Sequence, residues 1–332
     1  MTETNRQWQL ASRPHGHAGV DNFRLVETPV QPLADGQIRV RNQYLSLDPY
    51  MRGRMNDTRS YTAPQPLGAV MQGGTAGEVV ESRNPKFKTG DRVVGMLGWQ
   101  LYGTSEGEGL TRVDNDAVPL STWLGCVGMP GVTAWYGLNR IIRPKAGETV
   151  VVAAASGAVG SVVGQLARRQ GARAVGIAGG PEKCKVVTSE FGFDACVDHK
   201  AGHLVDDLAA ATPDRIDGDF ENVGGPVLDA VLARMNAFGR IAVCGLIADY
   251  DSEPTPMRNF ASVLINRLHV QGFIISEHTE IWHEATSELA ALVASSDLHY
   301  RESISDGIES APQAFLGLLK GGNFGKQLVK LF

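Results

Sequence analysis

The chain has 332 residues, of which 43% are hydrophobic and 20% charged, and its formal net charge is −5. Its length exceeds the usual size of one domain, so two domains are expected. Its negative net charge and the lack of a basic run argue against nucleic-acid binding. No apolar stretch approaches the length of a membrane span, and the polar start Met1–Gln9 is unlike a secretory signal. We therefore expect no membrane partner and a cytoplasmic location.

The first third of the chain is rich in turns and short β-like runs. Gln37–Val40 alternates polar and apolar residues, Gly77–Val80 follows a glycine pair, and Asp91–Gly95 follows a turn glycine. Strands at this density predict an antiparallel, partly barrel-like domain. The pattern changes near Cys126, and Met129 opens a helix with proline in its first turn.

From there on, strand-like and helix-like segments alternate. In chain order they are Thr149–Ala153, Val162–Gln170, Arg173–Ile177, Glu182–Phe191, Ala195–Val197, Leu204–Ala211, Gly218–Glu221, Val227–Arg234, Arg240–Cys244 and Phe260–Asn266. This rhythm predicts an α/β fold with a Rossmann, doubly wound parallel sheet. Ile281–Ser295 and Pro312–Leu319 have the pattern of amphipathic helices, and Gly325–Leu331 ends the chain as a strand-like run.

Two domains follow from this change of pattern. Residues 1–125 with 300–332 are expected to form the β-rich catalytic domain, and residues 126–299 the Rossmann domain. No low-complexity linker separates them, so we expect the two domains to meet at a cleft. Such a cleft is a typical place for a cofactor.

The four cysteines argue against a zinc site. Cys126, Cys184, Cys196 and Cys244 are widely dispersed, with no C-x-x-C pair and no nearby pair of histidines. A structural zinc ion needs four ligands delivered at close spacing. We therefore expect no bound metal and four reduced, mostly buried thiols.

A glycine pattern lies between the first predicted strand and helix of the Rossmann domain. Residues 154–164 read Ala-Ala-Ser-Gly-Ala-Val-Gly-Ser-Val-Val-Gly. Gly157 would allow a tight turn, Gly160 would let the backbone approach a pyrophosphate, and Gly164 would let the helix pack close to the strand. The spacing differs from the usual G-x-G-x-x-G, so a turn of small residues without a ligand remains an alternative.

The next strand indicates which dinucleotide is bound. In NAD-binding Rossmann units an acidic residue after this strand accepts a hydrogen bond from the ribose 2′-hydroxyl. Here the strand runs into Ala178, Gly179 and Gly180, which leave room for a 2′-phosphate, and Lys183 follows on the next helix. The sequence therefore predicts NADP(H), with a solvated lysine as the alternative for Lys183 and with the direction of Glu182 left open.

Six runs together resemble a known family. They are residues 45–52 (Leu-Ser-Leu-Asp-Pro-Tyr-Met-Arg), 129–134, 154–164, 221–225 (Glu-Asn-Val-Gly-Gly), 239–245 and 319–326. In this order and spacing the chain resembles the zinc-independent branch of the medium-chain dehydrogenase/reductase superfamily that holds leukotriene dehydrogenases, prostaglandin reductases and plant double-bond reductases. The resemblance implies a GroES-like catalytic domain and a homodimer.

The resemblance also implies NADPH-dependent reduction of a carbon–carbon double bond conjugated to a carbonyl, in a small enone or alkenal. The cofactor contacts that it implies are Ala158, Val159, Gly160, Ser161, Gly179, Lys183, Asn222, Cys244, Gly245, Leu246, Tyr250, Phe273, Ile274, Ile275 and Asn323. One position departs from the family, which has tyrosine where this chain has His199, before Lys200. A protonated histidine there could donate to the 2′-phosphate, or it could be a solvated loop residue.

Two tyrosines are the candidates for catalysis. Hydride addition to an enone moves negative charge to the carbonyl oxygen, and hydrogen-bond donors placed at that oxygen lower the barrier. Tyr50 follows Asp48 and a rigid proline, and Tyr250 lies on a loop after the strand Arg240–Cys244. With the ribose hydroxyl these phenols would stabilise the enolate, and a tyrosine or water would protonate the α-carbon. Ordinary aromatic packing is the alternative for each.

The predicted substrate contacts are Tyr50, Arg52, Trp99, Tyr102 and Met129. Arg52 would hold a substrate carboxylate, with an ion pair to an acid or an ordinary surface position as the alternatives. Trp99, Tyr102, Met129 and Phe273 would line an apolar pocket, although core packing explains each of them as well. Three other functions remain open: a quinone reductase of a neighbouring branch, an NADPH-binding protein without turnover, and a zinc alcohol dehydrogenase.

Overall fold

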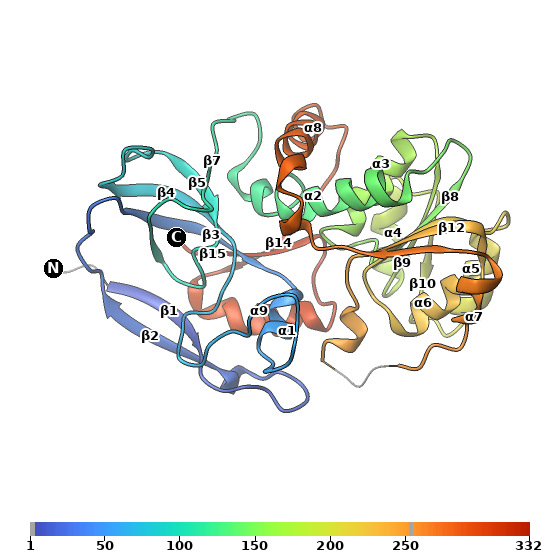
Figure 1. Ribbon diagram of the computed structural model, residues 1–332, viewed down its shortest axis with the longest axis horizontal. Helices are drawn as coiled ribbons and strands as arrows, with labels where there is room; N and C mark the ends of the chain where they lie inside the picture. The colour runs from blue at the N-terminus through green and yellow to red at the C-terminus, as the bar shows by residue number, and fades with distance from the viewer. Residues whose placement is uncertain (1–3, 252–254) are drawn as a thin grey trace. The chain divides into compact units, whose positions relative to one another are not determined.

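The structure is a computed structural model that describes residues 4–251 and 255–332 (Figure 1). Its contacts divide the chain into two compact units, Met1–Leu124 with Glu302–Phe332, and Gly125–Arg301. We call them unit 1 and unit 2 and describe each by itself. No helix in the described part of the chain is long and apolar enough to cross a membrane.

Unit 2 is built on a parallel sheet of six strands in the order β10-β9-β8-β11-β12-β13. Their bounds are β8 Thr149–Ala153, β9 Arg173–Ala178, β10 Ala195–Asp198, β11 Ile216–Glu221, β12 Met235–Val243 and β13 His269–Gly272. Counted along the unit, this order is 3-2-1-4-5-6, the strand order of a Rossmann fold. The predicted fold class is confirmed, and β8 has the predicted bounds because its five residues are all buried.

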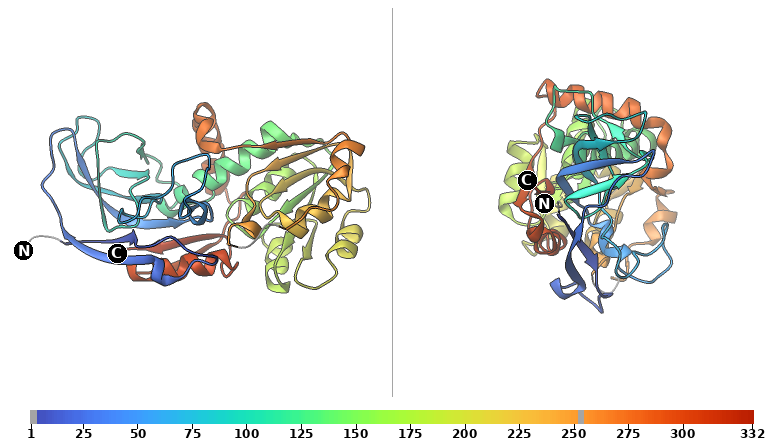
Figure 2. Two further views of the ribbon diagram at one scale, coloured as in Figure 1. Left: turned by 60° about the horizontal axis from the view of Figure 1, so that its bottom comes forward. Right: turned by 90° about the vertical axis from the view of Figure 1, so that its left-hand side faces the viewer.

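Helices cover both faces of this sheet (Figure 2). The helices are α2 Met129–Tyr136, the π-helix Gly137–Ile142, α3 Gly160–Arg169, α4 Pro181–Ser189, α5 Leu204–Ala211, α6 Gly225–Leu232, α7 Ala261–Ile265 and α8 Trp282–Ala294. On one face, Leu208 of α5 and Val231 of α6 pack with Val151 and Ile241 of the sheet. On the other, the π-helix approaches β11 so closely that a Cβ on Gly137 would lie 2.4 Å from the ring of Phe220.

Unit 1 holds a seven-stranded sheet in the order β14-β15-β3-β4-β5-β7, with β6 also paired to β3. The bounds are β3 Ile38–Leu47, β4 Thr75–Ser82, β5 Arg92–Gly95, β6 Tyr102–Ser105, β7 Thr111–Arg112, β14 Glu302–Asp306 and β15 Lys326–Lys330. All neighbours are antiparallel except β14 and β15. The last strand of the chain, β15, therefore lies inside a sheet of N-terminal strands (Figure 1).

Two further strands and two helices complete unit 1. The strands β1 Thr4–Leu10 and β2 Phe23–Pro29 form a separate antiparallel pair, and the helices are α1 Tyr50–Arg54 and α9 Ala311–Leu319. The rings of Phe23, Trp99 and Phe315 form the centre of the core here, with Phe23 stacked on Trp99 at 5.5 Å. Short 3₁₀ turns of unit 1 span Val20–Asn22, Leu120–Leu124 and Ile308–Ser310. Those of unit 2 span Ile247–Asp249, Ile275–Glu277 and Thr279–Ile281.

Several elements differ from the sequence-based prediction. The strands β1, β2, β6, β7, β13 and β14 were not predicted. Of these, β13 and β14 are edge strands with mostly exposed or half-buried residues, so they lack the apolar run that marks a buried strand. The helix predicted over Phe260–Asn266 is shorter, Ala261–Ile265.

Candidate functional site

The glycine turn joins the end of β8 to the start of α3. A Cβ on Gly160 would lie 2.4 Å from the carbonyl oxygen of Ala154, so only glycine lets the chain turn this tightly. The first helical bond runs from the Ser161 N–H to the Gly157 oxygen at 3.1 Å. The N–H groups of residues 158–160 therefore lie ahead of the helical ladder, where helix N-termini bind phosphate.

Gly164 has a different role from the predicted one. A Cβ there would lie 1.9 Å from the ring of Phe193, so the glycine makes room for an aromatic side chain rather than for strand backbone. Phe193 is buried and follows α4. The glycine thus fixes the distance between α3 and the segment that precedes β10.

The turn after β9 gathers positively charged groups. A Cβ on Gly179 would lie 2.9 Å from His199 Nε2 and 3.0 Å from Lys200 Cε, so both side chains lie over this glycine. Asp198 Oδ1 accepts hydrogen bonds from the N–H groups of Gly180 at 2.7 Å and Lys200 at 2.9 Å, which fixes the turn. The predicted Lys183 lies close enough for its charge to act on His199.

The electrostatics of this turn favour an anion. Burial and the charge of Lys200 lower the pKa of Lys183. Burial, Lys200 and Lys183 lower the pKa of His199, while Asp198 alone raises it. Asp198 stays ionised because two backbone N–H groups lower its pKa. A phosphate dianion would relieve the repulsion between the cations, so these residues fit the 2′-phosphate of NADP(H).

Sequence reasoning did not assign a role to Lys200. Its place beside Gly179 follows from the parallel pairing of β10 with β9, in which Asp198 lies opposite Ala178. That register brings the two strand ends together. The side chain of Glu182, whose direction was open, is exposed.

The ends of β8, β11 and β12 are tied together by backbone and amide groups. Asn222 Nδ2 donates to the Ala153 oxygen at 2.8 Å, which joins the first strand to the fourth. The N–H groups of Cys244 and Gly245 donate to the Glu221 oxygen at 2.9 and 3.2 Å. The predicted contacts Asn222, Cys244 and Gly245 therefore lie at the carboxyl ends of the strands, near the point where the strand order reverses.

Tyr250 folds back over the start of its own loop. The Leu246 N–H donates to Tyr250 Oη at 3.3 Å, and a Cβ on Gly245 would lie 3.1 Å from the same oxygen. The Ile247 and Ala248 N–H groups donate to the oxygens of Asn222 and Val223, which anchors the loop to the end of β11. The phenol thus lies at the carboxyl end of the sheet, as the glycine turn does.

Two buried carboxyl groups on β11 were missed by sequence reasoning. Asp219 is fully buried, and neither of its carboxyl oxygens has a hydrogen-bond partner among the described residues. Glu221 Oε1 accepts the N–H groups of Val223 at 2.5 Å and Gly224 at 2.9 Å. Burial raises the pKa of Glu221 to about 7, and burial together with Glu221 raises that of Asp219 well above its usual range.

Replacing Asp219 with valine is expected to stabilise the protein. The carboxyl group lies between Val151 and Ile241 on the neighbouring strands, and burial of an unpartnered polar group costs about 1–3 kcal/mol. Folding raises the pKa of Asp219, so the buried carboxyl group disfavours the folded state more strongly as the pH rises above the pKa that it has in the unfolded chain. The gain in urea midpoint should therefore be larger at pH 8 than at pH 5.

Asp217→Val is the matched control, on the same strand. Its carboxylate accepts the Thr149 N–H at 2.9 Å and the Asn236 amide at 2.8 Å, so its loss should destabilise the protein. A loss of stability in Asp219→Val as large as in Asp217→Val would contradict the conclusion that the buried Asp219 carboxyl group destabilises the fold.

In unit 1, two of the sequence motifs form one buried arrangement. Lys326 Nζ donates to Asp48 Oδ1 at 2.8 Å and to the Leu47 oxygen at 2.6 Å, and the two side chains are only 4% and 7% exposed. Ser46 Oγ donates to the other oxygen of Asp48. This ion pair holds the segment that leads into α1, whose first residue is Tyr50.

The phenol of Tyr50 is held in its neutral form. Burial and the charge of Asp48 raise its pKa well above the usual range, although Arg54, whose guanidinium lies 4.7 Å over the ring, acts in the opposite direction. A phenol in this state donates a hydrogen bond and does not act as a base at neutral pH.

Two of the predicted substrate contacts are corrected by the structure. Trp99 is 0% exposed and packs against Phe23 and Phe315, so it belongs to the core of unit 1. Arg52 is buried as well. Its guanidinium donates to Asn56 Oδ1 at 2.6 Å and to the Gly16 oxygen at 2.7 Å, so it joins two loops instead of facing a substrate.

The remaining predicted residues stay predictions. Tyr102 is buried on β6, its ring 5.8 Å from that of Phe332, and Met129 is half-buried at the start of α2. In unit 2, Phe273 and Ile275 are buried beside the half-buried Ile274. Asn323 lies in unit 1, its amide bonded to the Gly325 oxygen at 2.8 Å. Tyr50 and Tyr250 belong to different units, so their meeting at one site also stays a prediction.

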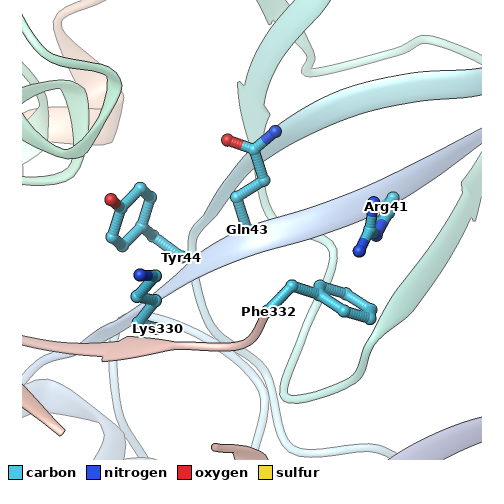
Figure 3. Close-up of a pocket in the computed structure, with 5 residues that line it drawn as sticks. All are labelled: Arg41, Gln43, Tyr44, Lys330 and Phe332. Atoms are coloured by element: carbon cyan, nitrogen blue, oxygen red, sulfur yellow. The ribbon is translucent and has the colours of Figure 1, made fainter. Parts of the chain in front are cut away.

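A cavity of about 260 Å³ lies in unit 1. It is lined by Arg41, Gln43, Tyr44, Lys330 and Phe332, which surround it in Figure 3. The Arg41 guanidinium lies 4.0 Å over the Phe332 ring.

Known proteins match over the whole length of the chain. A family model described as the N-terminal domain of oxidoreductase matches residues 6–113, and one described as zinc-binding dehydrogenase matches residues 158–292. NADPH-dependent curcumin reductase of Escherichia coli (strain K12) is 49% identical over 99% of this chain and 97% of its own length. The chain belongs to the medium-chain dehydrogenase/reductase superfamily.

Two further medium-chain relatives are similar over nearly the whole chain. The NADP⁺-dependent 2-alkenal reductase of Nicotiana tabacum is 41% identical over 98% of this chain and 97% of its own length. The crystal structure of CurA from Vibrio vulnificus in complex with NADPH has a TM-score of 0.94 and 44% identity, and covers 98% of this chain and 99% of the other. These matches confirm the zinc-independent branch predicted from the motifs.

Among residues 4–251 and 255–332, no group of three or more His, Cys, Asp or Glu side chains could hold a metal.

Proposed function

We propose that this protein is an NADPH-dependent reductase of the carbon–carbon double bond in α,β-unsaturated ketones and aldehydes. The observation that carries the cofactor is the cluster of Lys183, His199 and Lys200 around Gly179 at the end of β9. Support for the substrate class comes from full-length similarity to a curcumin reductase and a 2-alkenal reductase, both named for NADP(H) dependence.

The residues of unit 2 would hold the cofactor along the carboxyl ends of the strands. Residues 158–161 would bind the pyrophosphate at the start of α3, and Lys183, His199 and Lys200 would bind the 2′-phosphate. The residues that would hold the nicotinamide half end β11 and β12 and follow β13; they are Asn222, Cys244, Gly245, Leu246, Tyr250, Phe273, Ile274 and Ile275. Asn323 is a further candidate contact. When bound, the cofactor supplies the hydride.

The chain's own part in the reaction is to stabilise and protonate the enolate. Tyr50, held neutral, donates a hydrogen bond to the carbonyl oxygen as negative charge forms there. Tyr250 accepts a hydrogen bond from the Leu246 N–H, which holds its hydroxyl beside Gly245, and its phenol is the second candidate donor to the enolate. Unit 1 is then the catalytic domain, with Tyr102 as a candidate substrate contact, and Met129 of unit 2 is a further candidate.

Product analysis tests this function. Purified protein is incubated with NADPH and a small panel of enones, alkenals and benzoquinones, and the products are separated by mass. We expect the saturated ketone or aldehyde, with little allylic alcohol. Quinone turnover without saturation of the enone would favour the quinone reductase, and NADPH binding without any turnover would favour a binding protein.

Lys183→Ala is expected to weaken NADPH binding by about tenfold or more, because a charge-assisted hydrogen bond to the 2′-phosphate contributes about 1.5–3 kcal/mol. NADH lacks this phosphate, so its dissociation constant should change little. Titration of both cofactors by fluorescence measures the two effects. Lys185→Ala, an exposed lysine on the same helix, is the matched control. Equal losses for NADPH and NADH would refute the assignment.

We also propose a homodimer formed through the β13 edge of unit 2. The sheet ends at β13, and five large apolar side chains near this edge are exposed: Phe238, Phe260, Leu264, Ile265 and Val270. A second copy placed against this edge would pair the open strand and cover the apolar side chains. Val270→Asp should then shift the sedimenting species from dimer to monomer.

The cytoplasm is the proposed location. None of the four cysteines is in a disulfide, which suits a reducing compartment.

A further inference from the structure

We propose that His199 takes up a proton when the 2′-phosphate of NADPH binds, so that the preference for NADPH over NADH falls as the pH rises through neutrality. The inference rests on the proposed function, since it deepens the role of the same cofactor site. It concerns the histidine that precedes Lys200 at the end of β10.

The geometry brings His199 to the phosphate-binding turn. Its Nε2 lies 2.9 Å from where a Cβ on Gly179 would be, on the surface that the missing acidic residue leaves open. The ring is half-buried, so its protonation responds to neighbouring charges more strongly than that of a fully solvated histidine. The same surface holds Lys200, which follows it in the chain.

Every ionisable group that acts on His199 can be named. Lys200 and Lys183 disfavour its protonation and Asp198 favours it, with burial as the largest effect of all. The nearby thiols of Cys184 and Cys196 stay protonated because burial raises the pKa of both. The pKa of His199 is therefore below its ordinary value in the free protein, and the ring is neutral at pH 7.

A bound 2′-phosphate reverses this balance. In the free protein the two lysines and the ionised Asp198 leave one net positive charge around Gly179. A phosphate dianion changes this sum to one net negative charge, and a protonated His199 brings it to neutrality. An opposite charge within hydrogen-bond reach raises a histidine pKa, so binding and protonation favour each other. NADH brings no such charge.

The pH window follows from the direction of the shift. Since the pKa of His199 is higher in the complex than in the free protein, NADPH binds most tightly below the free-protein pKa, and affinity falls as the pH rises through the pKa of the complex. The 2′-phosphate itself loses its last proton near pH 6, roughly, which would oppose the effect at lower pH. Measurements between pH 7 and 9 avoid that overlap.

Calorimetric titration measures proton uptake directly. NADPH and NADH are titrated into wild type and His199→Tyr at pH 7.5, each in two buffers of different ionisation enthalpy and free of phosphate. We expect wild type to take up more protons with NADPH than His199→Tyr does, and no difference with NADH. From pH 7 to 9 the dissociation constant for NADPH should rise several-fold in wild type and change less than twofold in the variant.

Two further measurements keep the inference falsifiable. His199→Gln replaces the tyrosine variant if the latter binds no NADH, which is the check for an intact site. Lys200→Gln removes a positive charge that disfavours protonation of His199 in the free protein and in the complex alike, so the pH range over which NADPH affinity falls should move upward. Equal uptake in wild type and His199→Tyr overturns the proposal while NADPH-dependent enone reduction can still stand. Absence of NADPH binding to wild type instead overturns the proposed function.

Discussion

Lys326→Met is expected to lower the free energy of unfolding by about 3–5 kcal/mol, because it leaves the Asp48 carboxylate buried without its partner. The pair is nearly inaccessible to solvent, and Lys326 Nζ also donates to the Leu47 oxygen at 2.6 Å. Urea unfolding followed by near-ultraviolet circular dichroism measures the loss. Catalysis should fall with it, since Asp48 leads through a proline into Tyr50.

Lys330→Met is the matched control for this prediction. It makes the same change on the same strand, but Lys330 is exposed, so its effect should stay within about 0.5 kcal/mol. The double variant Asp48→Leu with Lys326→Met removes both charges and should lose less stability than the two single losses added together. If Lys326→Met is as stable as Lys330→Met, the ion pair does not hold this segment.

Tyr50→Phe is expected to lower kcat by about 10²–10³-fold, the usual effect of removing one hydrogen-bond donor from a developing oxyanion. Binding of NADPH should not change, because Tyr50 lies in unit 1 and the proposed phosphate contacts lie in unit 2. The pKa of Tyr50 is raised, so kcat should show no loss from phenol ionisation below pH 9. Steady-state rates with an enone measure the fall in kcat, and a pH profile of kcat tests the absence of a loss below pH 9.

Tyr250→Phe should give a comparable loss, and the double variant separates the two roles. If both tyrosines act on the same enolate, the double variant loses less than the product of the single effects. Tyr44→Phe, a half-buried tyrosine on β3 outside the proposed site, is the control and should leave kcat unchanged. Full activity in Tyr50→Phe would assign that ring to packing.

The sequence was most informative where periodicity and glycine spacing decide the structure. The strand-helix alternation from Thr149 onward predicted the Rossmann sheet, since buried parallel strands read as continuous apolar runs. The position of Lys183 after two glycines predicted a phosphate-binding turn at the end of β9, and the structure adds the positive charge of Lys200 there.

Sequence reasoning failed where a role depends on which distant residues come together. Lys200 reaches Gly179 only through the register of β10 on β9. Trp99 and Arg52 had the right chemistry for a substrate pocket, but the packing of Phe23 and Phe315 and the carbonyl of Gly16 decide where they lie. Asp219 looked like an ordinary acidic residue, because burial on both sides of a strand is a property of the whole sheet.

The place of β15 has a consequence for how the protein forms during synthesis. This strand pairs with β3 on one side and β14 on the other, and its Leu328 and Val329 are fully buried. The N-terminal strands of unit 1 leave the ribosome long before residue 326, so their sheet waits unfinished while all of unit 2 is made. Residues 125–301 are contiguous and can fold first. The sheet of unit 1 therefore keeps an open strand edge, which other chains could pair with, until the last strand is made.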